Sequence, residues 1–104
     1  MFAIKERQRV VDDKIINTFQ REVVSANILE VEAGTNGYHG GDSGHGSRTY
    51  IRIDSLADSD ITTHITPNGG VELLIGGDCE LETTIRALKF ITKVLEDQAA
   101  CVLD

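Results

Sequence analysis

The chain has no tryptophan, a single proline and only two cysteines, and it contains far fewer basic residues than acidic ones. No apolar run approaches the roughly 20 residues that a membrane-spanning helix needs. The first residues, Met1 to Arg7, lack the basic and then apolar order of a signal peptide. These absences predict a cytoplasmic protein without a membrane partner.

The two cysteines, Cys79 and Cys101, lie at opposite ends of the C-terminal helix predicted below. At a rise of about 1.5 Å per residue, such a helix holds them about 30 Å apart. A disulfide requires Cα atoms within about 7 Å of each other. We therefore expect no internal disulfide, in agreement with a reducing compartment.

Basic residues are scarce outside the N-terminal segment, and the formal net charge is −7. Residues 1–24 contain five basic and four acidic groups, whereas the rest of the chain contains five basic and thirteen acidic groups. Nucleic-acid affinity depends largely on Lys and Arg neutralising phosphates. The acidic balance therefore predicts that the protein has no nucleic-acid partner.

At 104 residues, the chain has the length of one domain, and we expect residues 1–104 to form a single domain. Its clearest predicted element is a helix over residues 79–98. Asp78 is the expected N-cap, since its carboxylate can accept a free N–H of the first turn. Apolar residues recur at steps of three and four and predict one buried stripe, formed by Leu81, Ile85, Leu88, Ile91 and Leu95.

Between residues 26 and 75 the hydrophobic period changes from 3.6 to 2, which is typical of strands with one covered face. The alternating apolar positions lie within residues 29–33, 50–53, 61–66 and 71–75. Pro67-Asn68-Gly69-Gly70 has the composition of a hairpin turn. These patterns predict an α+β fold, a four-stranded antiparallel sheet packed on a long C-terminal helix.

Residues 1–24 form either a helix or a strand. Val11, Ile15 and Phe19 have helical spacing, and Asp12 or Asp13 could start a helix at Lys14. The adjacent β-branched pairs Val10-Val11, Ile15-Ile16 and Val23-Val24 favour a strand instead. We favour a short helix here.

A glycine-rich loop over residues 34–47 is the best candidate for a binding site. It contains six of the ten glycines, and it is far longer than the usual hairpin loop of about two to five residues. The candidate binding residues are His39, Asp42, Ser43 and His45 within the loop, and His64 on a nearby strand.

The loop allows three interpretations. His39, Asp42 and His45 recur at every third residue and could ligate a divalent metal such as zinc, manganese or ferrous iron. Successive glycine N–H groups could instead bind a small anion. The third interpretation is that the glycines only permit turns and that the histidines face water.

A second set of polar residues is expected to lie on the exposed face of the predicted sheet. Arg48 and Arg52 can lie opposite Glu30 and Glu32 if their strands pair. Such residues either form cross-strand ion pairs of a few tenths of a kcal/mol each or present a polar face to a partner. We favour the ion pairs.

We interpret the chain as a small binding or assembly module that is not an enzyme and forms a homo-oligomer. A single helix over one sheet face leaves apolar positions such as Leu74 and Ile28 without cover. The alternative is a small metal-dependent enzyme that uses His39, Asp42 and His45 as ligands, with His64 or Ser43 assisting. We expect no cofactor, since the metal site needs a fourth ligand that the sequence does not supply.

Overall fold

The computed structural model describes residues 4–24, 28–37, 46–57 and 60–100. In this part of the chain, six strands precede one helix. Their bounds are Lys5–Val11 (β1), Lys14–Val24 (β2), Ile28–Thr35 (β3), Thr49–Ala57 (β4), Asp60–Ile65 (β5), Val71–Gly76 (β6) and Asp78–Ala100 (α1).

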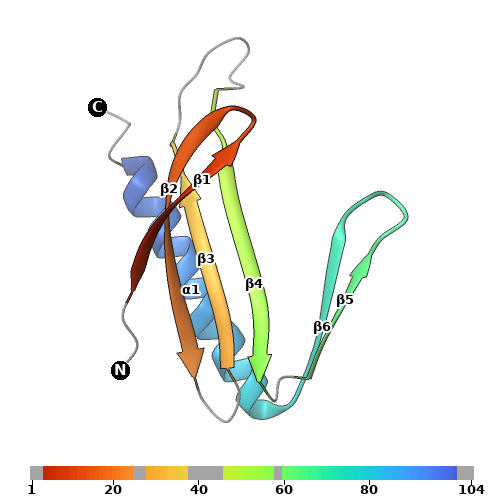
Figure 1. The fold of residues 1–104 in the computed structure, drawn as a ribbon. Coiled ribbons are helices and arrows are strands. Elements are labelled where there is room, and N and C mark those ends of the chain that lie inside the picture. Colours follow the sequence, from red (N-terminus) through yellow and green to blue (C-terminus); the bar gives the residue numbers. More distant parts are fainter. Residues whose placement is uncertain (1–3, 25–27, 38–45, 58–59, 101–104) are drawn as a thin grey trace.

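Strands β1 to β4 form an antiparallel sheet in sequence order, and α1 packs on one of its faces (Figure 1). Strands β5 and β6 form a separate two-stranded sheet that splays away from β4. The predicted fold class is confirmed: the protein is α+β, with a four-stranded antiparallel sheet against a C-terminal helix.

The strands that make up this sheet differ from those expected. The short helix favoured for residues 1–24 is wrong, because β1 and β2 form a hairpin there and supply half of the sheet. Asp12 and Asp13 connect the two strands with positive φ values of 50° and 68°. Two consecutive residues of this kind make the tight hairpin turn whose twist matches the twist of the flanking strands.

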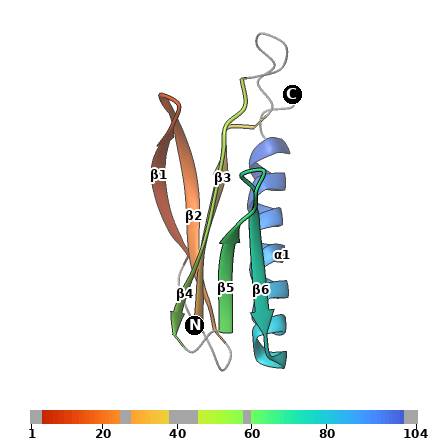
Figure 2. The same cartoon turned by 90° about the vertical axis from the view of Figure 1, so that its right-hand side faces the viewer.

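The main core lies between the sheet and α1, in the space seen edge-on in Figure 2. Alternate residues of the two central strands point towards the helix, because successive side chains of a strand face opposite sides. The buried residues of this core are Val23, Leu29, Val31, Ala33, Ala87 and Ile91. The alternation read from residues 29–33 therefore identified the covered face correctly.

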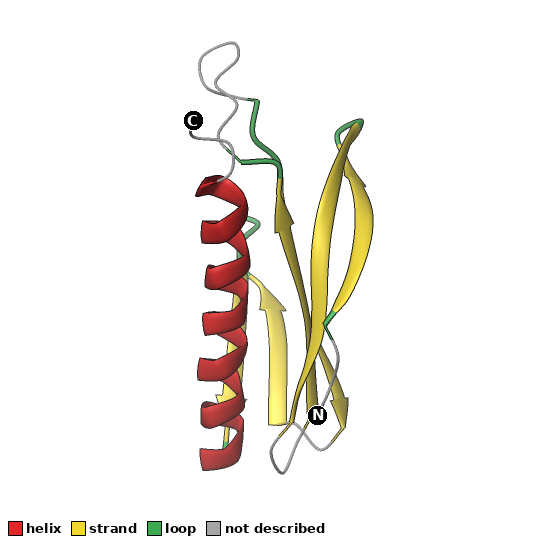
Figure 3. Ribbon diagram, turned by 90° about the vertical axis from the view of Figure 1, so that its left-hand side faces the viewer, coloured by secondary structure: helices red, strands yellow, loops and turns green. Residues whose placement is uncertain are grey.

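Helix α1 lies along one face of the sheet (Figure 3), and the side that it buries differs in part from the predicted stripe. Its buried residues are Thr83, Ala87 and Ile91, and the first two are small enough to let the helix approach the sheet closely. Of the predicted stripe, Leu81, Ile85 and Leu88 are exposed, whereas Ile91 is buried as expected and Leu95 packs against the core. The described helix is not long and apolar enough to cross a membrane.

The start of α1 also differs from expectation. The N–H of Leu81 donates a 3.0 Å hydrogen bond to the carbonyl of Gly77, which places Gly77 rather than Asp78 at the N-cap position. Gly77 has a φ of 104°, a conformation that residues with a Cβ rarely adopt.

The β5–β6 hairpin turns at the predicted position. The N–H of Gly69 donates to the carbonyl of Thr66 at 2.9 Å, and Gly69 has a φ of 81°. This is a three-residue hairpin loop closed by a glycine in the left-handed region. The pairing places Ile61, Ile65 and Leu73 on one face of the hairpin and Thr62, His64 and Glu72 on the other.

Candidate functional site

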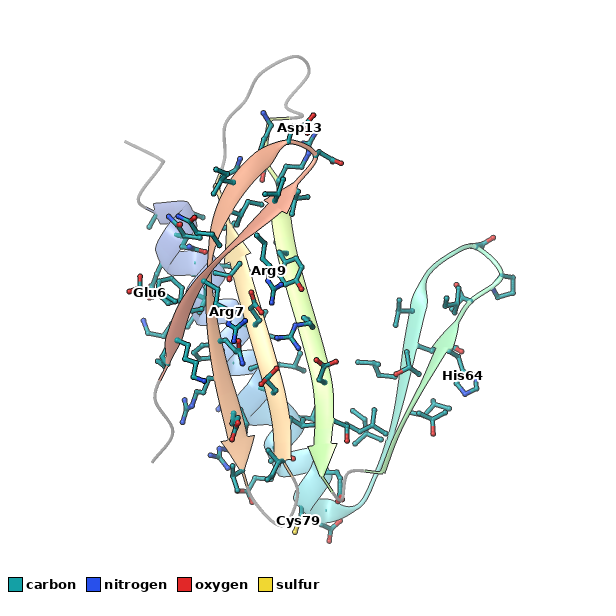
Figure 4. All side chains as sticks on the ribbon, in the orientation of Figure 1. Glu6, Arg7, Arg9, Asp13, His64 and Cys79 are labelled. Carbon is teal, nitrogen blue, oxygen red and sulfur yellow. The ribbon has the colours of Figure 1, made fainter. Side chains whose placement is uncertain are left out.

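The predicted site residues His39, Asp42, Ser43 and His45 lie outside the described residues, so their metal and anion sites stay predictions. His64 is described and lies on β5, exposed and directly opposite Glu72 of β6 (Figure 4). It belongs to the separate hairpin rather than to the four-stranded sheet. No group of three or more metal-ligating side chains occurs in the part of the chain that the structure covers.

The two ends of the glycine-rich loop are held together by side-chain hydrogen bonds, which we call the loop neck. Asn36 Oδ1 accepts from the N–H of Arg48 at 2.7 Å, and Thr35 Oγ1 donates to the carbonyl of Arg48 at 3.1 Å. Gln98 of α1 bridges two strands, because its Oε1 accepts from the N–H of Thr35 and its Nε2 donates to the carbonyl of Asn17. The neck is therefore fixed both to the sheet and to the helix.

An ion cluster with one buried carboxylate at its centre occupies the face of the sheet that points away from α1. At its centre Glu32 of β3 is completely buried, although its position in the alternation predicts a solvated face. Arg9 of β1 donates to both carboxylate oxygens at 2.6 Å, and Thr18 of β2 donates to Oε2 at 2.6 Å. Arg52 of β4 donates to Oε1 at 2.9 Å. One carboxylate thus joins all four strands.

Two further acids complete the cluster. Glu30 pairs with Arg52 at 2.9 Å, and Asp54 pairs with the same guanidinium. Arg9 also lies over the ring of Tyr50, 5.2 Å from its centroid. Since Tyr50 belongs to β4, this contact connects the first strand of the sheet with the last.

The hydrogen bonds of Arg9 lower the pKa of the Glu32 carboxyl from 4.5 to about 2, against the opposing effect of its burial. The hydrogen bonds to Glu32 in turn raise the pKa of both Arg9 and Arg52. Each Glu32 oxygen already accepts from two donors, and the group is ionised at neutral pH. It is therefore unsuited to proton transfer, and the cluster has a structural role.

The predicted charge pairing is only partly realised. Arg52 lies directly opposite Glu32 as expected, but Arg48 binds Asp12 at 2.9 Å. Arg9, the strongest partner of Glu32, was missed because its segment was expected to be helical. The alternation of Arg7 and Arg9 with Gln8 and Val10 was the available signal, since it has the period of a strand.

An open apolar groove separates the four-stranded sheet from the β5–β6 hairpin, and we call it the hairpin groove. Its volume is about 400 Å³. The sheet contributes Leu29 and Ile53, the hairpin contributes Ile61 and Leu73, and α1 contributes Leu88. The exposed part of the predicted helix stripe therefore borders the space beneath the hairpin.

Apolar exposure continues beyond this groove in both directions. Along the helix, Leu81 and Leu88 are 58% and 51% exposed, and Ile85 lies between them. At the tip of the hairpin, Ile65 and Val71 face each other across the two strands and are 80% and 67% exposed. Together these residues and the hairpin groove form one apolar surface, which we call the assembly surface.

The comparisons with known proteins assign no family to this arrangement. No protein-family model, no curated protein and no solved structure matches the chain. Function therefore has to be inferred from the assembly surface, the ion cluster and the loop neck themselves.

Proposed function

We propose that the protein is a self-assembling module in which a second copy of the chain covers the assembly surface. The observation that carries this proposal is the orientation of α1, which turns Leu81, Ile85 and Leu88 away from their own sheet. Contiguous exposed apolar patches are uncommon on monomers and mark sites of association. Filling the groove and burying this stripe supplies a hydrophobic driving force for assembly.

The hairpin supports a second copy as the partner. An isolated two-stranded hairpin is marginally stable, and three or more strands or packing on a helix are needed for independent stability. Each chain offers both a projecting hairpin with apolar residues at its tip and a helix with an uncovered apolar stripe. A two-fold axis satisfies both needs at once, because the hairpin of each copy then packs on the helix of the other.

The outer edge of β4 is a further point of contact, since β4 is the last strand of its sheet. Long exposed edge strands present unpaired backbone groups to other chains. A second copy seated in the hairpin groove lies beside this edge and covers it. As part of the same proposal, the protein acts in the cytoplasm, where the exposed thiol of Cys79 stays reduced.

The oligomeric state tests this function, measured by size-exclusion chromatography with light scattering at tens of micromolar protein. The wild type is expected to be a dimer. Leu88→Lys places a charge in the buried centre of the contact and is expected to give a monomer of unchanged circular dichroism. Because the lysine lowers the net negative charge, loss of the dimer cannot arise from added repulsion.

Ile15→Lys is the matched control, since it introduces the same charge at an apolar side chain that is 66% exposed on β2. We expect this variant to remain dimeric. A monomeric wild type, or equal dissociation of both variants, contradicts the proposal.

A further inference from the structure

A second groove lies on the other flank of α1, between the helix and the β1–β2 hairpin. We call it the flank groove. Its volume is about 660 Å³, and its apolar floor includes Phe19 of β2 together with Phe90 and Val94 of α1. Cavities of about 300–1,000 Å³ with mostly apolar walls are typical of small-molecule sites.

Basic side chains line this groove although the protein as a whole is acidic. Arg21, Lys89 and Lys93 are three of the ten basic residues in the chain, and all three line the same cavity. Lys93 is paired at 3.1 Å with Asp97, which also lines the groove. Arg21 and Lys89 form no ion pair within the residues that the structure covers, so two cations remain available to a ligand.

Arg21 lies where the basic side chains meet the apolar floor of the groove. Its guanidinium carbon lies 6.0 Å from the centroid of the Phe90 ring, at the edge of the apolar floor. A guanidinium binds carboxylates through two parallel hydrogen bonds. An anion held here would have its apolar part directly above Phe19, Phe90 and Val94.

We propose that the flank groove binds a small amphiphilic carboxylate, an unbranched acyl chain with one anionic head group. The head group pairs with Arg21 and Lys89, and the chain lies along the apolar floor. We favour a free carboxylate as the ligand over an anionic lipid that remains in a bilayer. The concave groove suits a single ligand, and the net charge of −7 opposes approach to an anionic bilayer.

Isothermal titration calorimetry with sodium decanoate below its micelle concentration tests the proposal. We expect saturable binding of one decanoate per chain. Acetate lacks the chain and is expected not to bind. Decyltrimethylammonium has the same chain with a cationic head and is expected to bind at least about tenfold more weakly, or by about 1.4 kcal/mol.

The variant Arg21→Gln/Lys89→Gln keeps the apolar floor and removes both available cations. We expect it to weaken decanoate binding by at least about tenfold. Its matched control is Arg7→Gln/Lys14→Gln, which makes the same charge change at two exposed residues that do not line the groove. The control is expected to bind like the wild type.

Three results overturn the inference. They are no binding of free decanoate, whether or not vesicles of anionic lipid bind, equal binding of the cationic amphiphile, and equal weakening by the variant and its control. The flank groove does not depend on the proposed assembly. Leu88→Lys is therefore expected to bind decanoate unchanged even though it is a monomer.

Discussion

Glu32 is the residue that holds together the polar face of the sheet, the face that points away from α1. It is fully buried, and its two oxygens accept from Arg9, Thr18 and Arg52 on three different strands. Removing one partner of a buried ion pair typically costs about 3–5 kcal/mol. The partial exposure of Arg9 and Arg52 places Glu32 at the lower end of this range.

Glu32→Gln is accordingly expected to lower the free energy of unfolding by about 3 kcal/mol. Urea denaturation at fixed protein concentration measures the effect, since stability depends on concentration in an oligomer. Glu30→Gln is the control, because it neutralises the neighbouring acid while Arg52 keeps its contacts with Glu32 and Asp54. A loss no larger for Glu32→Gln than for this control would refute the central role of Glu32.

The pH dependence of stability follows from the same residue. The pKa of Glu32 is about 2 in the folded chain, below its ordinary value of 4.5. The folded state therefore favours the ionised form, and the resulting stability is present above the unfolded pKa and is lost as pH falls. The difference corresponds to about 3 kcal/mol.

We expect the wild type to lose this contribution progressively between about pH 5 and pH 2, and Glu32→Gln to lack that part of the decline. Thermal unfolding of both proteins across this range, followed by circular dichroism, measures the difference. Parallel pH profiles would show that the lowered pKa contributes nothing to stability.

Gly34 is required because the backbone of β2 passes close to it, and not because of its own φ angle. A Cβ at this position would lie 2.3 Å from the carbonyl oxygen of Asn17 and 2.9 Å from the Cα of Thr18. Since these are backbone atoms of the neighbouring strand, β2 would have to shift.

Gly34→Ala is expected to destabilise the fold by about 1–3 kcal/mol, the usual cost of overpacking. Gly70→Ala serves as the control, because its Cβ would meet only the side chain of Thr66 at 3.0 Å. Denaturant midpoints compare the two variants. An unchanged midpoint for Gly34→Ala would mean that the two strands separate easily.

At the scale of elements, the β1–β2 turn stores local strain. Asp12 and Asp13 both have positive φ, and Asp12 also binds Arg48 at 2.9 Å. Asp13 is the better position for substitution, since glycine adopts this conformation without a Cβ penalty.

Asp13→Gly is expected to raise the free energy of unfolding by about 0.5–1 kcal/mol. The opposite change, Asp13→Val, introduces a β-branched residue at positive φ and is expected to destabilise the hairpin. A melting temperature that responds to neither substitution would contradict the assigned turn geometry.

These elements also show how far the sequence predicts the fold. Alternation over residues 29–33 and the Pro67–Gly70 turn are local signals, and both were interpreted correctly. The prediction for the β1–β2 hairpin is wrong because Asp-Asp is not the usual Asn-Gly of such turns. In addition, the helical spacing of Val11, Ile15 and Phe19 competed with the strand signal of the β-branched pairs. The orientation of α1 depends on how closely Thr83 and Ala87 approach the sheet, which hydrophobic spacing alone does not contain.

The candidate sites could likewise be predicted only in part from the sequence. The cross-strand pair of Glu32 and Arg52 followed from strand alternation. Neither the burial of Glu32 nor the flank groove could be predicted, because both arise where residues distant in sequence meet on a curved sheet. Arg21 and Lys89 are separated by most of the chain.

At the scale of the whole molecule, net charge and apolar surface oppose each other. Two copies of −7 repel on assembly, whereas the assembly surface favours contact. Salt screens the repulsion, since the Debye length falls from about 30 Å at 0.01 M to about 3 Å at 1 M.

The proposed dimer is therefore expected to tighten with added sodium chloride, by roughly tenfold or about 1.4 kcal/mol across that range. Analytical ultracentrifugation at several salt concentrations measures the change. Leu88→Lys provides the comparison and is expected to stay monomeric throughout. Dissociation of the wild type by salt would indicate an interface held by ion pairs instead.

The loop neck has a consequence for engineering of the chain. Thr35 and Asn36 fasten the departing strand to Arg48 of the returning strand, and Gln98 anchors this clasp to the helix. Loop length adds only slowly to the entropy of closure. The sheet and the helix are expected to fold unchanged when unrelated peptides of varied length replace the segment between Gly37 and Gly46. This end of the sheet can therefore display foreign peptides.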